Sequence, residues 1–214
     1  MKIAFISATL LSSSVAFSAT PIDGWYGSVF GGYTYLSDNI SETRNGLFRN
    51  EASYTSGSYN AGGRIGYKST PLRYEGELTY LQGNLTKFDI NFIRQSGITG
   101  QTQAALAMAN VYYDFPDIVP AISPFLGAGL GYAWIDASFG STGPSVGATY
   151  YKASNSVFAY QATAGITYNF AENYAVNLAY RHIGTDRVSD LNKVFQADLA
   201  SVGVIYRFDK ANYK

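Results

Sequence analysis

The 214-residue chain contains no cysteine, only 6 prolines and 1 histidine, and its formal net charge at pH 7 is +0. Without cysteine, the protein can have no disulfide, no thiolate metal ligand and no cysteine nucleophile. Its 15 basic and 15 acidic residues give none of the excess positive charge that a nucleic-acid partner requires, so no nucleic acid is expected. No carboxylates have the spacing of a calcium loop, and we expect neither a metal ion nor a cofactor.

A long apolar run is also missing after the N-terminal segment, which excludes a transmembrane helix. The N-terminal segment itself has the pattern of a secretory signal peptide. Lys2 supplies the positive charge, residues 3–15 are apolar or small, and Ala16-Phe17-Ser18 fits the small-x-small cleavage rule. Cleavage after residue 18 would leave residues 19–214 as one exported domain with a net charge of about −1. Cleavage after Ala19 is an alternative, and a short membrane anchor is the alternative role.

Aromatic residues and glycine are what the chain has in excess, with 19 Tyr, 13 Phe and 22 Gly. Aromatic residues are rarely so frequent in a soluble domain. A transmembrane β-barrel explains the composition, because Tyr and Trp lie at the two water–lipid borders of such a barrel and Gly allows close approach inside a narrow lumen.

Eight segments alternate between apolar and polar residues with the period of a β-strand, and helical periodicity is absent after the signal. The predicted strands are Gly24–Leu36, Ser58–Tyr67, Leu72–Asn84, Gln103–Phe115, Pro124–Ile135, Val157–Phe170, Tyr174–Ile183 and Ala197–Phe208. The alternation continues through residues 88–92, so strands three and four are expected to project beyond the membrane.

Long and short connections follow one another between these strands. The long loops are residues 37–57, 85–102, 136–156 and 184–196, and the short links are residues 68–71, 116–123 and 171–173. A barrel has this pattern when one rim faces the cell exterior and the other the periplasm. The predicted fold class is therefore all-β, an eight-stranded antiparallel up-and-down transmembrane β-barrel.

The strands have one aromatic and one charged face. In the third strand, Tyr74, Leu78 and Tyr80 oppose Arg73, Glu75 and Glu77. A secreted lipocalin is also an eight-stranded barrel, but its interior is apolar and its charges face water. Because the tyrosines cluster at strand ends, where two interfacial belts would lie, we place the aromatic face against lipid and the charged face in the lumen.

An eight-stranded barrel is only wide enough for its own side chains. Inward charges must then be paired, because a lone charge in a poorly solvated interior is costly. We predict a buried network of Glu75 and Glu77 with Arg64 and Arg181, and with Arg207 as a further candidate. The network is interpreted as a structural plug; the alternative is a gate for a small ion path.

The last predicted strand carries a polar residue, a glycine two positions on, and two aromatic residues that flank one residue at the end. These are Ser201, Gly203, Tyr206 and Phe208. The pattern resembles the C-terminal targeting signal of bacterial outer-membrane β-barrels, whose last strand is recognised by the barrel-assembly machinery. Six residues follow Phe208, whereas the commonest pattern ends in Phe.

The whole mature chain is similar to the outer membrane protein A-like small barrels, including the opacity-type surface antigens of Gram-negative pathogens. The motifs are Gly24-Trp25-Tyr26-Gly27, residues 110–115, residues 123–132, Tyr180-Arg181 and Tyr206-Arg207-Phe208. The resemblance implies the bacterial outer membrane as location, membrane lipid and lipopolysaccharide as partners, and an internal ion cluster. It also implies a structural anchor whose four extracellular loops serve envelope integrity, adhesion or host interaction; a minor pore is the alternative.

Some barrels of this size are enzymes, and the lipid A deacylases use a His–Ser–acid arrangement that faces the outer leaflet. His182 lies near the outer end of its strand on the lipid face, with Thr185, Asp186 and Ser189 as conceivable partners. Residue 184 is Gly where that arrangement has Ser, so we expect no catalytic residues and interpret His182 as an interfacial polar residue.

Residues 127–131, Gly-Ala-Gly-Leu-Gly, look like part of a phosphate-binding glycine loop. They continue as a strand, with no helix after them, so the context of a nucleotide site is missing. Small residues that leave room in the lumen are the better explanation.

Overall fold

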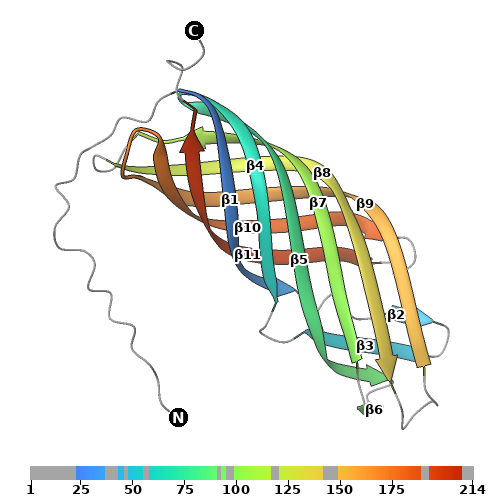
Figure 1. Cartoon of the computed structure of the whole chain (residues 1–214). Coiled ribbons are helices and arrows are strands. Elements are labelled where there is room, and N and C mark those ends of the chain that lie inside the picture. Colours follow the sequence, from blue (N-terminus) through green and yellow to red (C-terminus); the bar gives the residue numbers. More distant parts are fainter. Residues whose placement is uncertain are drawn as a thin grey trace, which may run out of the picture.

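The computed structural model describes residues 23–36, 43–45, 48–54, 58–90, 93–94, 99–116, 121–141, 149–188 and 193–208. Eight long antiparallel strands form a closed barrel (Figure 1). They are β1 (Gly24–Leu36), β4 (Tyr59–Ser69), β5 (Leu72–Ile90), β7 (Thr99–Asp114), β8 (Ile122–Ser141), β9 (Thr149–Asn169), β10 (Tyr174–Val188) and β11 (Lys193–Arg207). Within these ranges, no helix has the length and apolar character needed to cross a bilayer.

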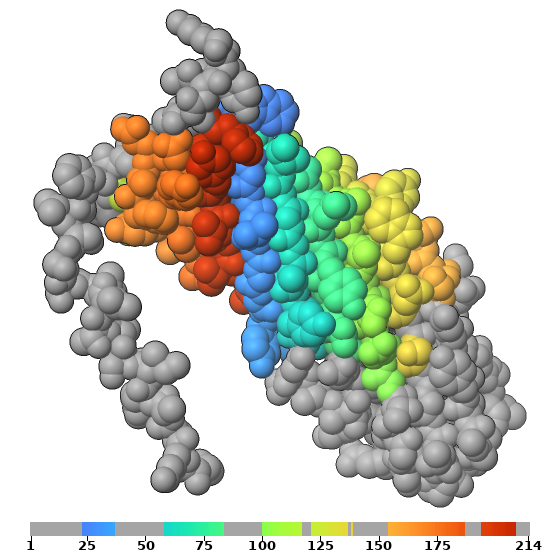
Figure 2. Space-filling model, in the orientation of Figure 1, coloured from blue at the N-terminus to red at the C-terminus, as the bar shows by residue number. Residues whose placement is uncertain are grey.

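The first and last strands close the wall. β1 pairs with β11 along one side and with β4 along the other, while β5 pairs with β7. Figure 2 shows β11 (red) lying directly against β1 (blue), which in turn lies against β4 (teal). Closure removes the edges that an open sheet would present, as required of a barrel in lipid.

The two ends of the barrel differ, and we name them by their connections. At the turn end, β4 connects to β5 through residues 70–71 and β9 connects to β10 through residues 170–173. At the opposite end, the loop end, lie three short strands, β2 (Thr43–Asn45), β3 (Phe48–Tyr54) and β6 (Ile93–Arg94) (Figure 1).

Residues 37–57 are predicted as one long loop, but the structure has the short strands β2 and β3 within them. β3 pairs with the far half of β5, from Tyr54 opposite Leu85 to Asn50 opposite Ile90. β5 continues beyond Asn84 to Ile90, in agreement with the predicted alternation through residues 88–92, and the backbone of this extension forms hydrogen bonds with β3. This pairing has no sequence signal because it depends on a partner strand rather than on alternation.

Of the eight predicted strands, the first has the observed bounds and the others differ at their ends. The structure has Tyr59–Ser69 for 58–67, Leu72–Ile90 for 72–84, Thr99–Asp114 for 103–115, Ile122–Ser141 for 124–135, Thr149–Asn169 for 157–170, Tyr174–Val188 for 174–183 and Lys193–Arg207 for 197–208. The largest change is in β8 and β9, which stay in register from Ile122 opposite Tyr168 to Ser141 opposite Thr149. Most of the loop predicted at residues 136–156 is therefore hairpin.

Burial alternates along the barrel strands and confirms the predicted faces. On β5, Tyr74 and Leu78 are exposed while Glu75 and Glu77 are buried. The outward side chains are aliphatic at mid-height, and aromatic rings gather toward both ends. Toward the loop end these are Tyr33, Tyr35, Tyr59, Tyr80, Tyr132, Trp134, Phe158, Tyr160 and Tyr180; toward the turn end they are Trp25, Tyr67, Tyr74, Tyr113, Tyr168, Phe170, Tyr174, Tyr206 and Phe208. This is the inverse of a lipocalin.

Candidate functional site

The lumen is mainly apolar toward the loop end, where the buried polar residues include Thr34, Ser58 and Thr185, and it is polar toward the turn end. The half toward the loop end is filled by one hydrophobic cluster, which we call the apolar plug: Leu36, Leu81, Ala104, Leu106, Met108, Ala133, Ile135, Ala159, Ile183, Phe195, Ala197 and Leu199, with Val157 against it. Leu81, Ile183 and Leu199 are completely buried. Such close-packed side chains exclude water and hydrated ions.

The polar half begins with Arg181, next to the plug on the side of the turn end. This guanidinium is completely buried and donates from Nη1 to Glu77 Oε1 at 2.6 Å. Its Nη2 donates to Ser201 Oγ at 2.9 Å and to Asn60 Oδ1 at 3.3 Å. Arg181 thus connects β10 to its neighbour β11 and, across the lumen, to β4 and β5. The ion pair satisfies charges that could not be left alone there.

Two further arginines join the carboxylates one level lower. Arg64 Nε lies 3.6 Å from Glu77 Oε2 and 3.7 Å from Glu75 Oε2, so one cation bridges the two acids. Arg73 Nη1 donates to Glu75 Oε1 at 3.0 Å. The Tyr26 hydroxyl donates to the same oxygen. Glu75, Glu77, Arg64, Arg181 and Arg73 form what we call the ion cluster.

Aromatic rings complete the surroundings of these arginines. The guanidiniums of Arg64 and Arg181 each lie 4.3 Å from the centre of the Phe30 ring. Arg73 lies 4.6 Å from the ring centres of both Tyr112 and Phe125. A cation over an aromatic face is attracted by about 0.5–2 kcal/mol, so the rings stabilise the cations where water cannot.

The glycines of β8 give these inward side chains their space, as expected for residues 127–131. A Cβ on Gly127 would collide with the Tyr112 ring, and a Cβ on Gly129 would collide with the side-chain oxygen of Asn110. The sequence of β8 thus determines how far the large side chains of β7 can reach into the lumen.

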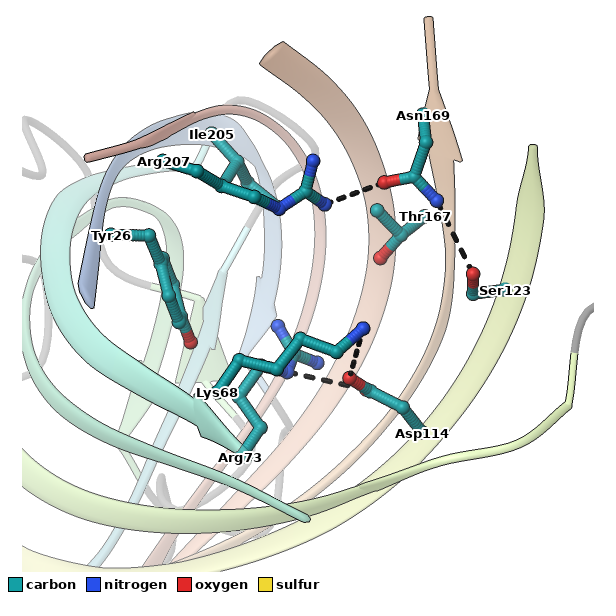
Figure 3. Close-up of a pocket in the computed structure, with 9 residues that line it drawn as sticks. All are labelled: Tyr26, Lys68, Arg73, Asp114, Ser123, Thr167, Asn169, Ile205 and Arg207. Carbon is teal, nitrogen blue, oxygen red and sulfur yellow. Dashed lines mark hydrogen bonds and ion pairs between the residues drawn. The ribbon is translucent and has the colours of Figure 1, made fainter. Parts of the chain in front are cut away.

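The turn end of the lumen, which we call the mouth, is polar and partly open (Figure 3). Asp114 lies here, with Oδ2 3.4 Å from Lys68 Nζ and Oδ1 3.2 Å from Arg73 Nε. Arg207 donates to Asn169 Oδ1 at 2.5 Å and to the Glu172 carbonyl at 3.2 Å.

The expectation that Arg207 joins Glu75 and Glu77 is corrected by these contacts. Its side chain does face the lumen, but it binds neutral oxygens at the mouth. Arg73 takes part in the cluster instead, and Lys68 and Asp114 form a second charged group nearer the turn end. Strand alternation places all three side chains in the lumen, so their inward direction could be predicted from the sequence. Their height along the barrel axis could not.

On the outer surface, His182 and Asp198 meet across β10 and β11. His182 Nδ1 lies 2.8 Å from Asp198 Oδ1, and the Tyr180 hydroxyl donates to the same oxygen at 2.7 Å. Of the conceivable partners, Thr185 is buried and its hydroxyl accepts from the Phe195 amide, Asp186 is exposed, and residue 189 lies outside the described residues. In the described part of the chain, His182 has no hydrogen bond to a serine or threonine.

The four residues of the C-terminal pattern lie on both faces of β11. Ser201 and Gly203 are buried toward the lumen, whereas Tyr206 and Phe208 face outward with ring centres 5.4 Å apart. The residues the structure describes contain no group of three or more side chains that could hold a metal ion.

Comparisons with known proteins place the chain. The family model of the outer membrane protein beta-barrel domain matches residues 3–208. A curated relative, an outer membrane protein of Gluconacetobacter diazotrophicus, is 29% identical over 210 residues, which are 86% of this chain and 53% of the relative. The chain thus spans about half the length of that relative.

Two solved structures share the fold. Neisserial surface protein A has a TM-score of 0.56 at 17% identity, with 86% of this chain and 97% of that chain covered. The outer membrane protein OprG of Pseudomonas aeruginosa also has a TM-score of 0.56, at 10% identity, with 88% and 99% covered. Because the family model covers nearly the whole chain and the wall is a closed eight-stranded barrel with an aromatic outer surface, this protein belongs to the outer membrane protein beta-barrel family and resides in the bacterial outer membrane.

Proposed function

We propose that the protein is a structural surface anchor, closed to solutes, whose four extracellular loops serve envelope integrity and adhesion or host interaction. The observation that carries this proposal is the lumen, which is filled at two successive levels by the apolar plug and the ion cluster. A transport path would have to cross both levels. The turn end faces the periplasm and the loop end faces the exterior, as is general for barrels of this family.

The loop end supports the display role. β5, β8 and β9 extend well past the aromatic belt, and β3 pairs with the extension of β5. A rigid wall that carries loops away from the lipid surface is a common platform for recognition. The outer aromatic belt lies at the level of the lipid headgroups, where lipopolysaccharide is the partner we propose.

Two further assignments belong to this proposal. Residues 1–18 act as a signal peptide that is removed on export, leaving residues 19–214. The barrel-assembly machinery reads Ser201, Gly203, Tyr206 and Phe208; the outward rings of Tyr206 and Phe208 support this, because they are the ones a partner at the lipid side could reach. Phe208→Ala should reduce assembled barrel in cells while leaving refolding into detergent unchanged, with Phe170→Ala as a control on the same aromatic belt.

We propose that the protein is not an enzyme. His182 contacts the carboxylate of Asp198, but among the described side chains no serine or threonine hydroxyl lies beside it to act as a nucleophile. Glu75 and Glu77 are buried in a filled lumen, where no substrate fits. A minor pore is the second candidate, and conductance in planar bilayers separates it from the anchor.

The conductance test uses four proteins: wild type, Glu77→Ala, Leu106→Ala and the double variant. Either single change should leave conductance near the baseline, because the other level still seals the lumen. The double variant should show openings. A large, stable conductance of the wild type would refute the closed anchor.

The display role is tested with intact cells that carry the protein. Deleting each extracellular loop in turn should lower binding to host matrix or host cells for at least one loop, while the amount of folded barrel stays constant. If every deletion bound like the wild type, adhesion would be excluded and envelope integrity would remain as the role.

A further inference from the structure

The mouth holds an excess of positive charge. The charged side chains that line the described lumen are Arg64, Lys68, Arg73, Arg181 and Arg207 against Glu75, Glu77 and Asp114. Five cations therefore face three carboxylates. Because these side chains are largely shielded from water, the imbalance favours the entry of a negative charge from outside.

The pairing pattern shows where the excess lies. Glu77 forms ion pairs with Arg181 and Arg64, and Glu75 forms ion pairs with Arg73 and Arg64. Asp114 is shared by Lys68 and Arg73 at the mouth. Arg207 is the cation without a carboxylate partner in this set, because both of its hydrogen bonds go to neutral oxygens, those of the Asn169 side chain and the Glu172 main chain. Among the described residues Arg207 has no ion pair, so within this part of the chain the uncompensated charge lies at the turn end.

The three cations at the mouth are shielded from water, and one of them has a donor without a partner. Arg73, Arg207 and Lys68 are 4%, 6% and 8% exposed. Arg73 Nη2 has no hydrogen-bond partner among the described atoms although it is buried. Figure 3 shows the head groups of these three residues directed into one cavity, with Asp114 on its wall.

The size of the cavity selects the ligand. Counted as room for the centre of a water-sized sphere, its volume is about 20 Å³, and about 10–15 Å³ on this measure holds one water. The innermost space therefore holds one species of about the size of a water molecule, which favours a small monatomic anion over a larger oxyanion. Metal cations are repelled by the surplus positive charge.

We propose that the mouth binds a single monatomic anion, chloride in the periplasm, held by Arg207 together with Arg73 and Lys68. The anion neutralises the charge that the carboxylates leave over. Asp114 opposes the anion, so it limits affinity while it fixes the positions of Lys68 and Arg73. The site goes beyond the anchor role and does not depend on it.

A crystal of the wild-type barrel grown with bromide in place of chloride tests the site directly. An anomalous peak is expected in the cavity, within hydrogen-bond distance of Arg207 and of Arg73 or Lys68. An empty cavity, or a carboxylate of the chain itself in that position, would overturn the proposal.

Chloride-35 line broadening, measured on the folded protein in an uncharged detergent, tests it in solution. Arg207→Gln should weaken binding about tenfold, which equals 1.4 kcal/mol. Asp114→Asn should strengthen binding, and Asp186→Asn, the same charge change on the exposed loop-end surface, should leave it unchanged. Broadening that is the same in wild type and Arg207→Gln would mean an adventitious ion only. If Arg207→Gln does not fold, the contrast between Asp114→Asn and Asp186→Asn decides, since equal affinities in those two would equally refute the site.

Discussion

The two halves of the lumen fill the same narrow space by different physics. Toward the loop end, the apolar plug packs aliphatic side chains and the Phe195 ring, and a side chain of similar volume can replace another there at modest cost. Toward the turn end, the ion cluster depends on particular partners, because each buried charge is tolerated only while its counter-charge is present. The comparison teaches that the plug should respond to how much volume is lost, and the cluster to which atom is lost.

The largest effect is expected in the cluster. Glu77→Ala leaves the completely buried Arg181 without its carboxylate and deprives Arg64 of one of its two partners. We expect a loss of about 3–5 kcal/mol in the free energy of unfolding. Urea unfolding of the barrel in detergent micelles, followed by the fluorescence of its 2 tryptophans, measures it.

A double variant sharpens the same comparison. Glu77→Leu with Arg181→Met removes both charges and retains the volume, so it should cost less than Glu77→Ala alone, because no lone charge remains at that level. If the double variant were the less stable of the two, the cluster would owe its stability to the pair itself, and the contrast between the halves would be wrong.

The plug should give a smaller loss that is graded with volume. Leu106→Ala removes three carbons from a side chain that is 1% exposed and should cost about 2–4 kcal/mol, whereas Ile183→Val removes one and should cost about 1 kcal/mol. The same urea titration reads both. Equal losses for the two substitutions would contradict a plug that responds to volume.

Strand alternation was sufficient to predict the faces, because the side-chain period of a strand is exact and one face is charged. That is why Arg64, Glu75, Glu77 and Arg181 could be placed in the lumen from the sequence. The same alternation put Arg207 inside, correctly, but said nothing of its height.

Height depends on strand tilt, which alternation does not encode. Arg207 is opposite Tyr26, Tyr26 is opposite Gly66, and Gly66 is opposite Glu75. Strand pairing therefore places Arg207 and Glu75 in the same row of paired residues, three strands apart. Strands about 4.8 Å apart and tilted by about 40° displace them by roughly 9 Å along the barrel axis. This displacement places Arg207 at the mouth.

The smallest effect is expected outside both halves, at His182. Its imidazole faces outward, is partly exposed and contacts Asp198 on the neighbouring strand. His182→Asn retains a polar side chain and touches neither the plug nor the cluster, so the free energy of unfolding should change by less than about 0.5 kcal/mol. Mass spectrometry of lipid A from cells that produce either protein should find the same acyl chains. A change in acylation that appears with the wild type and vanishes in His182→Asn, with Asp186→Asn as the control, would instead make the outer surface rather than the lumen the chemically active part of the molecule.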